Sequence, residues 1–404
     1  TTSPMPIMPP PIPKEFLVLL LTVSASAKYS SLFDCPRIDP PPMAENVSEL
    51  HPAHVSIVMA AGDSITAAFA ARGTLLEARD ISWSIGVGSK DQITLPWLLA
   101  QYSQKVEGMS TKAKLPKGVT HLPHGDYHDG TDHLNVAESE GAVHDNSLVE
   151  QWGLLSSHLK KYDDLDSRWK VLTIWMTAND VCGKCDGPLS EQYLAEWGGG
   201  TEQFIANITS MTKRVYINLI STLDLSRVAY LQRQQAYCKF EHQHLLNECG
   251  CIDKGNATQL AQMDENVHTM NTELHKIAAK WQQKFADQGR SDVAIEVQPF
   301  QEGLGDTLDF EFLSDLDCFH PSHHAHQSLA IGLWNSMLCT DDRAHRCGSL
   351  FSKDMKPVCP DTNSRFYTGP DVVPVIPPAV SGTTYSGSPS AAVAPNTDDD
   401  GIFG

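Results

Sequence analysis

A serine with the surroundings of a nucleophile follows an apolar run near residue 60. The run Val55–Ala60 (VSIVMA) is typical of a buried strand, and Gly62-Asp63-Ser64 comes directly after it. At a strand-to-helix turn, the serine Oγ is exposed at the carboxyl edge of the sheet. Its N–H lies at a helix N-terminus, where partial positive charge can stabilise an oxyanion. The alternative is an ordinary Gly-Asp-Ser turn that caps a helix.

A histidine with an acidic partner occurs in the segment DCFHPS near the other end of the chain. Asp317 precedes His320 by three residues. In a tight turn, its carboxylate can accept from the second ring nitrogen and orient the histidine as a general base. Because His323, His324 and His326 follow, the alternatives are a polar loop and a metal-binding loop.

Two further candidate residues follow apolar runs. Asn179 comes after Val171–Met176 (VLTIWM), and Gly141 comes after Leu134–Ala137 (LNVA). In an open parallel sheet, the carboxyl ends of the strands meet at one crevice. The Asn179 amide and the Gly141 N–H could therefore complete an oxyanion hole with the Ser64 N–H. Each of these two residues, taken alone, is more often a turn residue.

The elements that must position these residues alternate along the chain. Strands are predicted at the three runs above and at Val215–Ile220 and Ala294–Val297. Strands separated by helices pair in parallel and are covered on both faces. We therefore predict an α/β fold, a three-layer α/β/α sandwich with a central, mostly parallel sheet. Helices are predicted over Ser190–Lys213, Gln259–Phe285 and Gln327–Leu338, and a long surface loop over Ser103–Gly130.

The order of these blocks resembles a known family. Ser64, Gly141, Asn179 and His320 follow one another as in the GDSL, or SGNH, hydrolases. The resemblance covers roughly residues 55 to 340 and is closest to the phospholipase B branch. The stretches that carry it are ISWSIG (81–86), TLPWLL (94–99), LNVA (134–137), WKVLTIWMTANDVCGKC (169–185), VYINL (215–219) and DCFHPS (317–322).

The resemblance implies a role for each of five residues. Ser64 would be the nucleophile, His320 the general base and Asp317 the residue that orients it. The oxyanion would be held by the N–H groups of Ser64 and Gly141 and by the Asn179 side chain. The protein would be a serine esterase that acts on phospholipids, lysophospholipids or other acyl esters. No metal or organic cofactor is implied, and a transient contact with a membrane surface fits such a substrate.

The chain departs from the family pattern at two places. The family has Gly-x-Asn-Asp where this chain has Thr177 as the first of the four residues, so a side chain is added beside the site. The second block is one residue longer between Ala137 and Gly141 and carries Glu138 and Glu140, whose carboxylates would oppose an oxyanion. Two alternatives therefore stay open: a catalytically impaired protein that binds lipid or a partner, and an esterase of acetylated polysaccharide.

Composition excludes several classes of protein. The 404 residues carry a net charge of -19, which disfavours binding to nucleic acid. No apolar run reaches the ~18 residues of a membrane span. The sequence does not indicate an oligomeric state.

The N-terminus and the cysteines indicate secretion. Lys14, the apolar run Phe16–Val23 and Ala25-Ser26-Ala27 have the layout of a signal peptide cleaved after Ala27, although a buried strand or helix is the alternative. Ten cysteines and three glycosylation sequons, at Asn46, Asn207 and Asn256, fit an oxidising compartment. The predicted units are a signal peptide (1–27), a Pro-rich segment (28–53), the catalytic domain (54–340), a Cys-containing extension (341–365) and a disordered Pro/Ser/Thr-rich tail (366–404).

The pair Cys182-x-x-Cys185 has three interpretations. The first is a short disulfide between the two residues, as expected in a secreted chain. The second is a zinc half-site completed by Cys249 and Cys251, and the third is a thioredoxin-like redox pair. The sequence alone assigns no disulfide connectivity.

Overall fold

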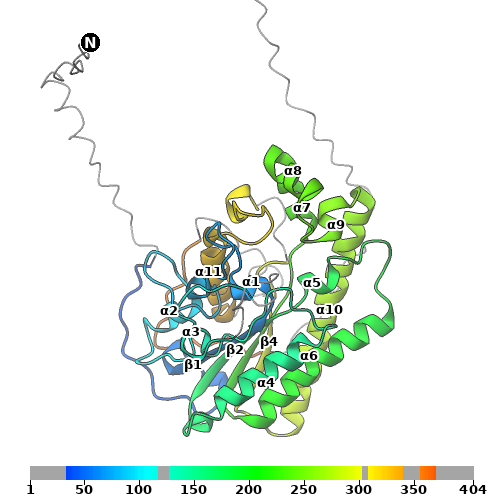
Figure 1. Ribbon diagram of the computed structural model, residues 1–404. Helices are drawn as coiled ribbons and strands as arrows, with labels where there is room; N and C mark the ends of the chain where they lie inside the picture. Colours follow the sequence, from blue (N-terminus) through cyan, green and yellow to red (C-terminus); the bar gives the residue numbers. More distant parts are fainter. Residues whose placement is uncertain (1–32, 117–126, 303–307, 340–354, 370–404) are drawn as a thin grey trace, which may run out of the picture.

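A parallel sheet forms the centre of the computed structural model, which describes residues 33–116, 127–302, 308–339 and 355–369 (Figure 1). Its strands lie in the order β1-β2-β3-β4. Almost every strand residue is buried, because helices cover both faces of the sheet. The strands are β1 (Val55–Gly62), β2 (Trp169–Trp175), β3 (Val215–Ile220) and β4 (Val293–Gln298).

The predicted strand at Leu134–Ala137 is not a strand in the structure, and that prediction is wrong. The segment instead makes one parallel bridge beside β1, in which Ala60 N donates to Leu134 O and Val136 N donates to Ala60 O, at 3.1 and 3.0 Å. With this segment included, the order becomes 2-1-3-4-5, as in doubly wound folds. The order in which the chain adds strands to the sheet reverses at β1. In such folds the ligand crevice lies at this switch point, beyond the carboxyl end of the strand.

Two apolar clusters confirm the three-layer α/β/α arrangement. Ile57 and Met59 of β1 contribute to the cluster shared with α4 (Ser147–Leu159), α6 (Glu191–Met211) and α10 (Ala257–Asp287). Val58 and Ala60 point to the opposite face, which α2 (Leu95–Leu99) and α11 (His323–Leu338) cover. The alternation along β1 follows from the two-residue period of a strand.

Three of the helices match the predicted ones. The predicted ranges at Ser190, Gln259 and Gln327 correspond to α6, α10 and α11, with ends that differ by a few residues. Several elements were not predicted, above all α4 and the three helices of the α7–α9 segment (226–254). The remaining elements are α1 (Ser64–Ala67), α3 (Asp129–Asp132), α5 (Ala178–Val181), α7 (Ser226–Gln234), α8 (Ala236–His244), α9 (Gly250–Lys254) and the 3₁₀ turns Val47–Glu49, Pro52–His54, Arg79–Ile81, Leu165–Ser167 and Phe310–Phe312.

Segments from both ends of the described chain pack on the domain. Cys35 and Cys359 form a disulfide. Phe366 is buried and donates its N–H to Leu50 O at 2.9 Å, so the folded part includes the first residues of the predicted tail, 366–369. The predicted signal peptide and the rest of the tail lie outside the described residues, as does 117–126 of the predicted loop. No described helix combines the length and the apolar character that crossing a membrane requires.

Candidate active site

Ser64 lies where β1 passes into α1. Asp63 is the N-cap of α1 and accepts from Ile65 N at 2.9 Å, and Ser64 is the first residue of the helix. Gly62 packs so closely on the Trp175 carbonyl and on Thr66 that a Cβ would lie within 3.0 Å of both. The Ser64 N–H belongs to the first turn, whose N–H groups have no acceptor within the helix. The turn therefore presents both a hydroxyl and a free donor at the end of the strand.

Asp317 and His320 lie in the loop between Phe310–Phe312 and α11. The Asp317 carboxylate accepts from the backbone N–H groups of Phe319 and His320, both at 3.0 Å. Ser314 closes the loop, because its N–H donates to the His320 carbonyl at 2.8 Å. The carboxylate and the imidazole are thus fixed in one turn, three residues apart.

The structure brings the three predicted residues into one chain of hydrogen bonds. The distance between His320 Nε2 and Ser64 Oγ is 2.9 Å, and that between His320 Nδ1 and Asp317 Oδ2 is 2.8 Å. All three side chains are buried. A carboxylate only accepts, so Nδ1 carries a hydrogen and the neutral ring can accept the Ser64 proton at Nε2. This is the arrangement of an activated serine nucleophile.

The charges of the pair support each other. Burial disfavours the charged form of Asp317, but the attraction of His320 and the hydrogen bonds to the carboxylate outweigh burial and lower its pKa. Burial likewise disfavours the His320 cation, but Asp317 outweighs that effect and raises the His320 pKa above its ordinary value. The pair therefore stabilises the imidazolium that forms when His320 takes a proton.

Gly141 and Asn179 lie together but not as expected. Asn179 Nδ2 donates to Gly141 O at 2.9 Å, and Gly141 N donates to Glu138 O at 3.0 Å. The expectation that Gly141 offers a free N–H therefore does not hold in this conformation, because the Glu138 carbonyl accepts that hydrogen. The Gly141 carbonyl instead orients the Asn179 side chain. An amide group has two donor hydrogens, so Asn179 keeps one for another acceptor.

The longer second block is absorbed as a turn. Glu140 takes up a left-handed backbone conformation, with φ of 66°, and the chain returns to a tightly packed Gly141. A Cβ on Gly141 would lie 2.8 Å from Ser147 Oγ and 2.9 Å from Glu138 O. The glycine is thus required by close packing. The extra side chain at Thr177 is buried, and its Oγ1 has no hydrogen-bond partner among the described residues.

Residues beyond the predicted site residues hold these blocks in place. Asp180 accepts from the N–H groups of Val143 and His144, at 3.0 and 3.2 Å, and so ties the second block to α5. Arg79 is buried and donates to the carbonyls of Asn135 and Ala137. Asp180 directly follows Asn179 and was visible as a polar neighbour, whereas Arg79 gives no local sequence signal of its contacts.

Asp63 was named only as part of the turn, although its carboxyl group is unusual. Its Oδ2 is buried and has no hydrogen-bond partner among the described residues. Burial raises the pKa of Asp63 to about 7, against the opposing effect of the bond from Ile65. This carboxyl group therefore changes its charge within the physiological pH range, one residue from Ser64.

The cysteines beside the site pair across the fold. Cys182 bonds to Cys249 and Cys185 bonds to Cys251, so the predicted bond between Cys182 and Cys185 is wrong. The nine cysteines of the described residues are all disulfide-bonded, and these residues contain no cluster that could hold a metal ion. A third bond, Cys238–Cys318, joins α8 to the loop of Asp317 and His320. The α7–α9 segment is thus linked covalently to both sides of the site.

A second histidine–aspartate pair lies behind the first. His242 Nδ1 is 2.8 Å from Asp253 Oδ1, and His242 Nε2 is 2.6 Å from the backbone carbonyl of Asp317. Because Asp253 Oδ1 and the Asp317 carbonyl are acceptors, both ring nitrogens must carry hydrogens for both bonds to form. Gln232 Nε2, at 3.2 Å from His242 Nε2, then donates nothing to that nitrogen. Burial opposes that cation, but Asp253 and the Asp317 carbonyl outweigh burial and raise the His242 pKa. His242 therefore holds the backbone of Asp317.

An apolar cavity of about 60 Å³ borders His320. Its walls come from the start of α7, from the His320 loop and from the end of β2, and they are almost wholly hydrocarbon. The side chains around it include Ile65, Trp175, Leu225, Phe312, Phe319 and Leu329. The cavity offers an apolar group a place next to the reacting atoms.

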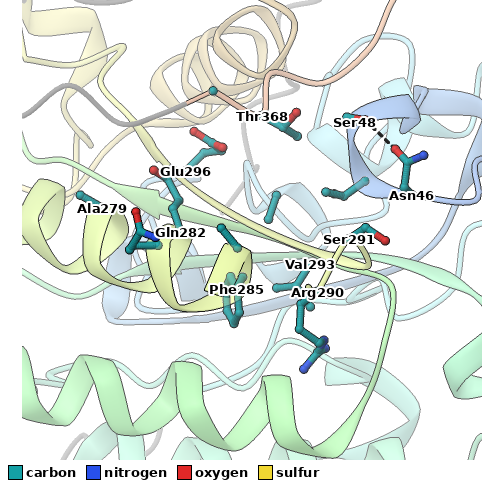
Figure 2. A pocket seen from close by; sticks show the side chains of 15 residues that line it. Asn46, Ser48, Ala279, Gln282, Phe285, Arg290, Ser291, Val293, Glu296 and Thr368 are labelled. Carbon is teal, nitrogen blue, oxygen red and sulfur yellow. Dashed lines mark hydrogen bonds between the residues drawn. The ribbon is translucent and has the colours of Figure 1, made fainter. Parts of the chain in front are cut away.

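A larger hollow lies elsewhere among the described residues. It measures about 690 Å³ and is lined by the start of β4 at Val293, by the end of α10 and by Asn46 and Ser48 (Figure 2). It contains none of the residues of the hydrogen-bonded chain, which lie beyond the carboxyl ends of the strands. Size alone therefore does not identify the site.

The comparisons agree with this geometry. A model of the family described as GDSL-like Lipase/Acylhydrolase matches residues 58–333. This chain belongs to that family. Membership in the GDSL family, together with the Ser64–His320–Asp317 geometry, supports a hydrolase that acts on esters.

Relatives in the GDSL family include two phospholipases. "Phospholipase B1, membrane-associated" of Homo sapiens is 28% identical over 337 residues, which are 80% of this chain and 21% of the relative. The protein of the same name from Mus musculus is 27% identical over 333 residues, 78% of this chain and 21% of that protein. The chain thus spans about a fifth of the length of these relatives.

Similar solved structures include two esterases. A carbohydrate esterase of family 3 from Talaromyces cellulolyticus is 15% identical, with a TM-score of 0.35 over 68% of this chain and 93% of that chain. An acetyl esterase mutant with acetate ion has a TM-score of 0.34 and the same coverage and identity.

Proposed function

We propose that this protein hydrolyses acyl esters of phospholipids or lysophospholipids through an acyl-serine intermediate on Ser64. The observation that carries the proposal is the bond of 2.9 Å between His320 Nε2 and Ser64 Oγ. The phospholipase B1 names of the relatives and the apolar cavity beside His320 support a lipid ester as substrate.

In the proposed reaction, Ser64 Oγ attacks the ester carbonyl while His320 Nε2 takes its proton. Asp317 keeps the ring oriented and stabilises the imidazolium. Collapse of the tetrahedral intermediate releases the alcohol, which receives the proton from His320, and leaves the acyl group on Ser64. A water molecule, deprotonated by His320, then attacks the acyl-serine and frees the fatty acid.

The negative charge on the carbonyl oxygen needs donors in the transition state. The Ser64 N–H and the second hydrogen of Asn179 Nδ2 are the two that we assign to this role. Gly141 would add a third only if its N–H left the Glu138 carbonyl. Loss of one such donor costs roughly a hundred- to a thousandfold in rate, so catalysis with two donors is expected to be slow.

The acyl group is assigned to the apolar cavity beside His320. Its volume of about 60 Å³ is smaller than the ~150 Å³ of a cavity that binds benzene. The cavity accommodates the first carbons of a chain, and its lining is apolar apart from Gln301 and His320. An acetyl group would fit there as well, with the sugar as the leaving alcohol, so the choice of a lipid ester rests on the phospholipase B1 names of the relatives.

A fluorophosphonate probe tests the reaction directly. The wild-type protein should gain the mass of one probe molecule less HF, because Ser64 Oγ displaces the fluoride, and Ser64→Ala should gain none. Product analysis should then show fatty acid released from phosphatidylcholine or lysophosphatidylcholine and no acetate released from acetyl-xylan. Absence of labelling in the wild-type protein would favour the second candidate, a catalytically impaired lipid-binding protein, which the engaged Gly141 N–H supports.

We also propose that the protein is exported and that its chain is cleaved after Ala27. The disulfide bonding of all nine described cysteines supports an oxidising compartment. Expression in secretory cells, followed by N-terminal sequencing of protein from the medium, tests this. Retention in the cell, or a mature chain that begins upstream of Lys28, would contradict it.

A further inference from the structure

Exposed apolar side chains are concentrated on the α7–α9 segment. Half of the large hydrophobic side chains that are exposed among the described residues fall between positions 230 and 245. Tyr230, Tyr237, Phe240 and Leu245 are 62%, 43%, 56% and 69% exposed. These four residues are called the apolar patch below. A concentration of this kind, unlike single exposed residues, marks an interaction surface.

Helix α8 has two distinct faces. Cys238 and His242, four residues apart, are buried and bind the loop of Asp317 and His320 through a disulfide and a hydrogen bond. Tyr237 and Phe240, three residues apart, lie on the other side and are exposed. The inner face binds the loop, whereas the outer face is open to solvent and carries Tyr237 and Phe240 beside the polar Lys239, Gln243 and His244.

One member of the patch packs near the apolar cavity beside His320. The ring of Tyr237 lies edge-on to that of Phe310, with centroids 6.2 Å apart. Phe310 does not itself line the cavity, but Leu308 and Phe312, two residues away on either side, do. In Figure 1, α7 and α8 project from the molecule on the same side as α1 and α5, which begin at Ser64 and Ala178. The helices that carry the patch and the helices that begin at the site residues thus lie toward the same end of the molecule (Figure 1).

The charge of the two helices differs from that of the chain. Over α7 and α8, three basic residues, Arg227, Arg233 and Lys239, stand against one acidic residue, Glu241, a net charge of +2 where the chain carries -19. A self-association through this face would bring like charges together, because the same patch meets itself across a two-fold axis. A phospholipid surface, with apolar chains beneath phosphate groups, complements both the hydrocarbon and the charge.

We infer that the outer face of α7 and α8 docks the protein on a phospholipid surface, with the apolar patch inserted among the lipids and the exposed Lys239 at the phosphates. Arg233 is already engaged, because its guanidinium donates to the carbonyls of Ile252 and Gly255. The inference rests on the proposed function for its choice of lipid as the partner. Docking through α8 would bring the cavity entrance next to the membrane, so that an acyl ester reaches Ser64 without crossing water.

The test uses the full chain and a pair of matched variants. Phe240→Asp/Leu245→Asp removes two members of the patch, and Leu75→Asp/Val149→Asp changes two equally exposed residues elsewhere. Each protein is cosedimented with vesicles of phosphatidylcholine and with vesicles that also contain phosphatidylserine. Hydrolysis of a water-soluble ester is measured in parallel, and sedimentation velocity gives the oligomeric state.

The patch variant should bind vesicles at least about tenfold more weakly than the wild type, while the control variant binds as the wild type does. Addition of phosphatidylserine should strengthen wild-type binding. Hydrolysis of the soluble ester should be the same in all three proteins. Equal vesicle binding by the patch and control variants would overturn the inference, and so would a wild-type dimer that the patch variant abolishes. Vesicle binding by a protein that cleaves no ester would refute the proposed function and leave the docking surface standing.

Discussion

The two sides of the candidate site are held by different kinds of interaction. Ser64 is fixed by the sheet, since it follows a buried strand that pairs with β2 along its whole length. Asp317 and His320 follow no strand. Their loop is closed by Ser314, whose Oγ also donates to the Ala70 carbonyl, and it is further held by the Cys238–Cys318 bond and by His242. The nucleophile thus depends on the cooperative sheet, whereas the base depends on individual bonds, two of which come from the α7–α9 segment. Loss of those two bonds can therefore disturb the base side while the sheet remains intact.

The largest effect should come from removing either end of the hydrogen-bonded chain. Ser64→Ala and His320→Ala should each lower kcat for ester hydrolysis by at least about a thousandfold. The double variant should be little worse than either, because the two residues act as one unit. Steady-state kinetics with a soluble ester gives the values. A single variant that keeps a tenth of the activity would contradict the assignment of Ser64 or His320. Losses that simply add in the double variant would show that the two residues do not act as one unit.

The next effect concerns the charge on the base side. Asp317→Asn should lower kcat by up to about 10⁴-fold, because the neutral amide no longer stabilises the imidazolium. His320 must be neutral to accept a proton, so activity should be lost when acidification protonates it. Because its pKa is raised above the ordinary histidine value of 6.5, this loss should begin at a higher pH than for an ordinary histidine. In Asp317→Asn this inflection should move to lower pH. A pH profile of kcat/KM with the same inflection in both proteins would contradict the assignment.

Disulfide removal should separate the two sides. Cys238→Ser/Cys318→Ser should lower kcat by roughly ten- to a hundredfold, since small displacements of a reacting group cost this much. Cys35→Ser/Cys359→Ser is the matched control, because it also removes one long-range bond but far from Ser64. Both variants should lose about 2–5 kcal/mol of stability. Equal kcat values for the two variants at a temperature where both are folded would show that the Cys238–Cys318 bond does not position His320.

A smaller effect is expected at His242. His242→Ala should lower kcat by about tenfold with little change in KM, because the Asp317 backbone loses its donor. His242→Gln can still donate to the Asp317 carbonyl and should recover part of the activity. A purely structural role would instead lower the thermal midpoint of both variants and leave kcat of the folded fraction unchanged. The kcat and KM values of the two variants, measured below their midpoints, decide between these roles.

The last prediction concerns the sheet side and is read from the thermal midpoint of unfolding, with no expected change in kcat. The pKa of Asp63 is raised from 3.8 to about 7, so its protonated form favours the folded state. That contribution is complete below about pH 4 and is lost as the pH rises through 7. Asp63→Asn keeps the oxygen that caps Ile65 and cannot ionise. Its advantage in thermal midpoint should therefore grow from pH 4 to pH 8, by about 2–4 °C for each kcal/mol. The exposed Asp91→Asn should show no such trend.

Much of the sheet side was predictable from the sequence. The apolar runs at β1, β2 and β3 are long enough to identify buried strands, and a serine after the first of them has a defined place at the sheet edge. Ala294–Val297 and Leu134–Ala137 are runs of only four residues, each with one polar member, and such a run does not distinguish a strand from a single bridge: the first is part of β4, and the second makes one bridge. That the Gly141 N–H turns to Glu138 depends on the backbone of the extra residue, which the residue types do not determine.

The base side was predictable only in part. Asp317 and His320 are three residues apart, so their contact follows from a local turn. His242 meets Asp317, and Asp253 meets His242, only after α7–α9 has folded over the loop. Helices α7 and α8 are nine residues each and rich in polar residues, so each offers too short an apolar pattern to be predicted. The cysteine pairs are likewise set by tertiary approach. For this reason two neighbours in a Cys-x-x-Cys motif bonded to distant residues and not to each other.

The Cys35–Cys359 bond has a consequence for chain connectivity. It links positions 324 residues apart, so that β1 to β4 and every residue of the candidate site lie within one covalent ring. A single proteolytic cut at any peptide bond inside that ring opens it but releases no fragment. The two pieces of the nicked protein therefore stay joined by the Cys35–Cys359 bond until a reductant separates them.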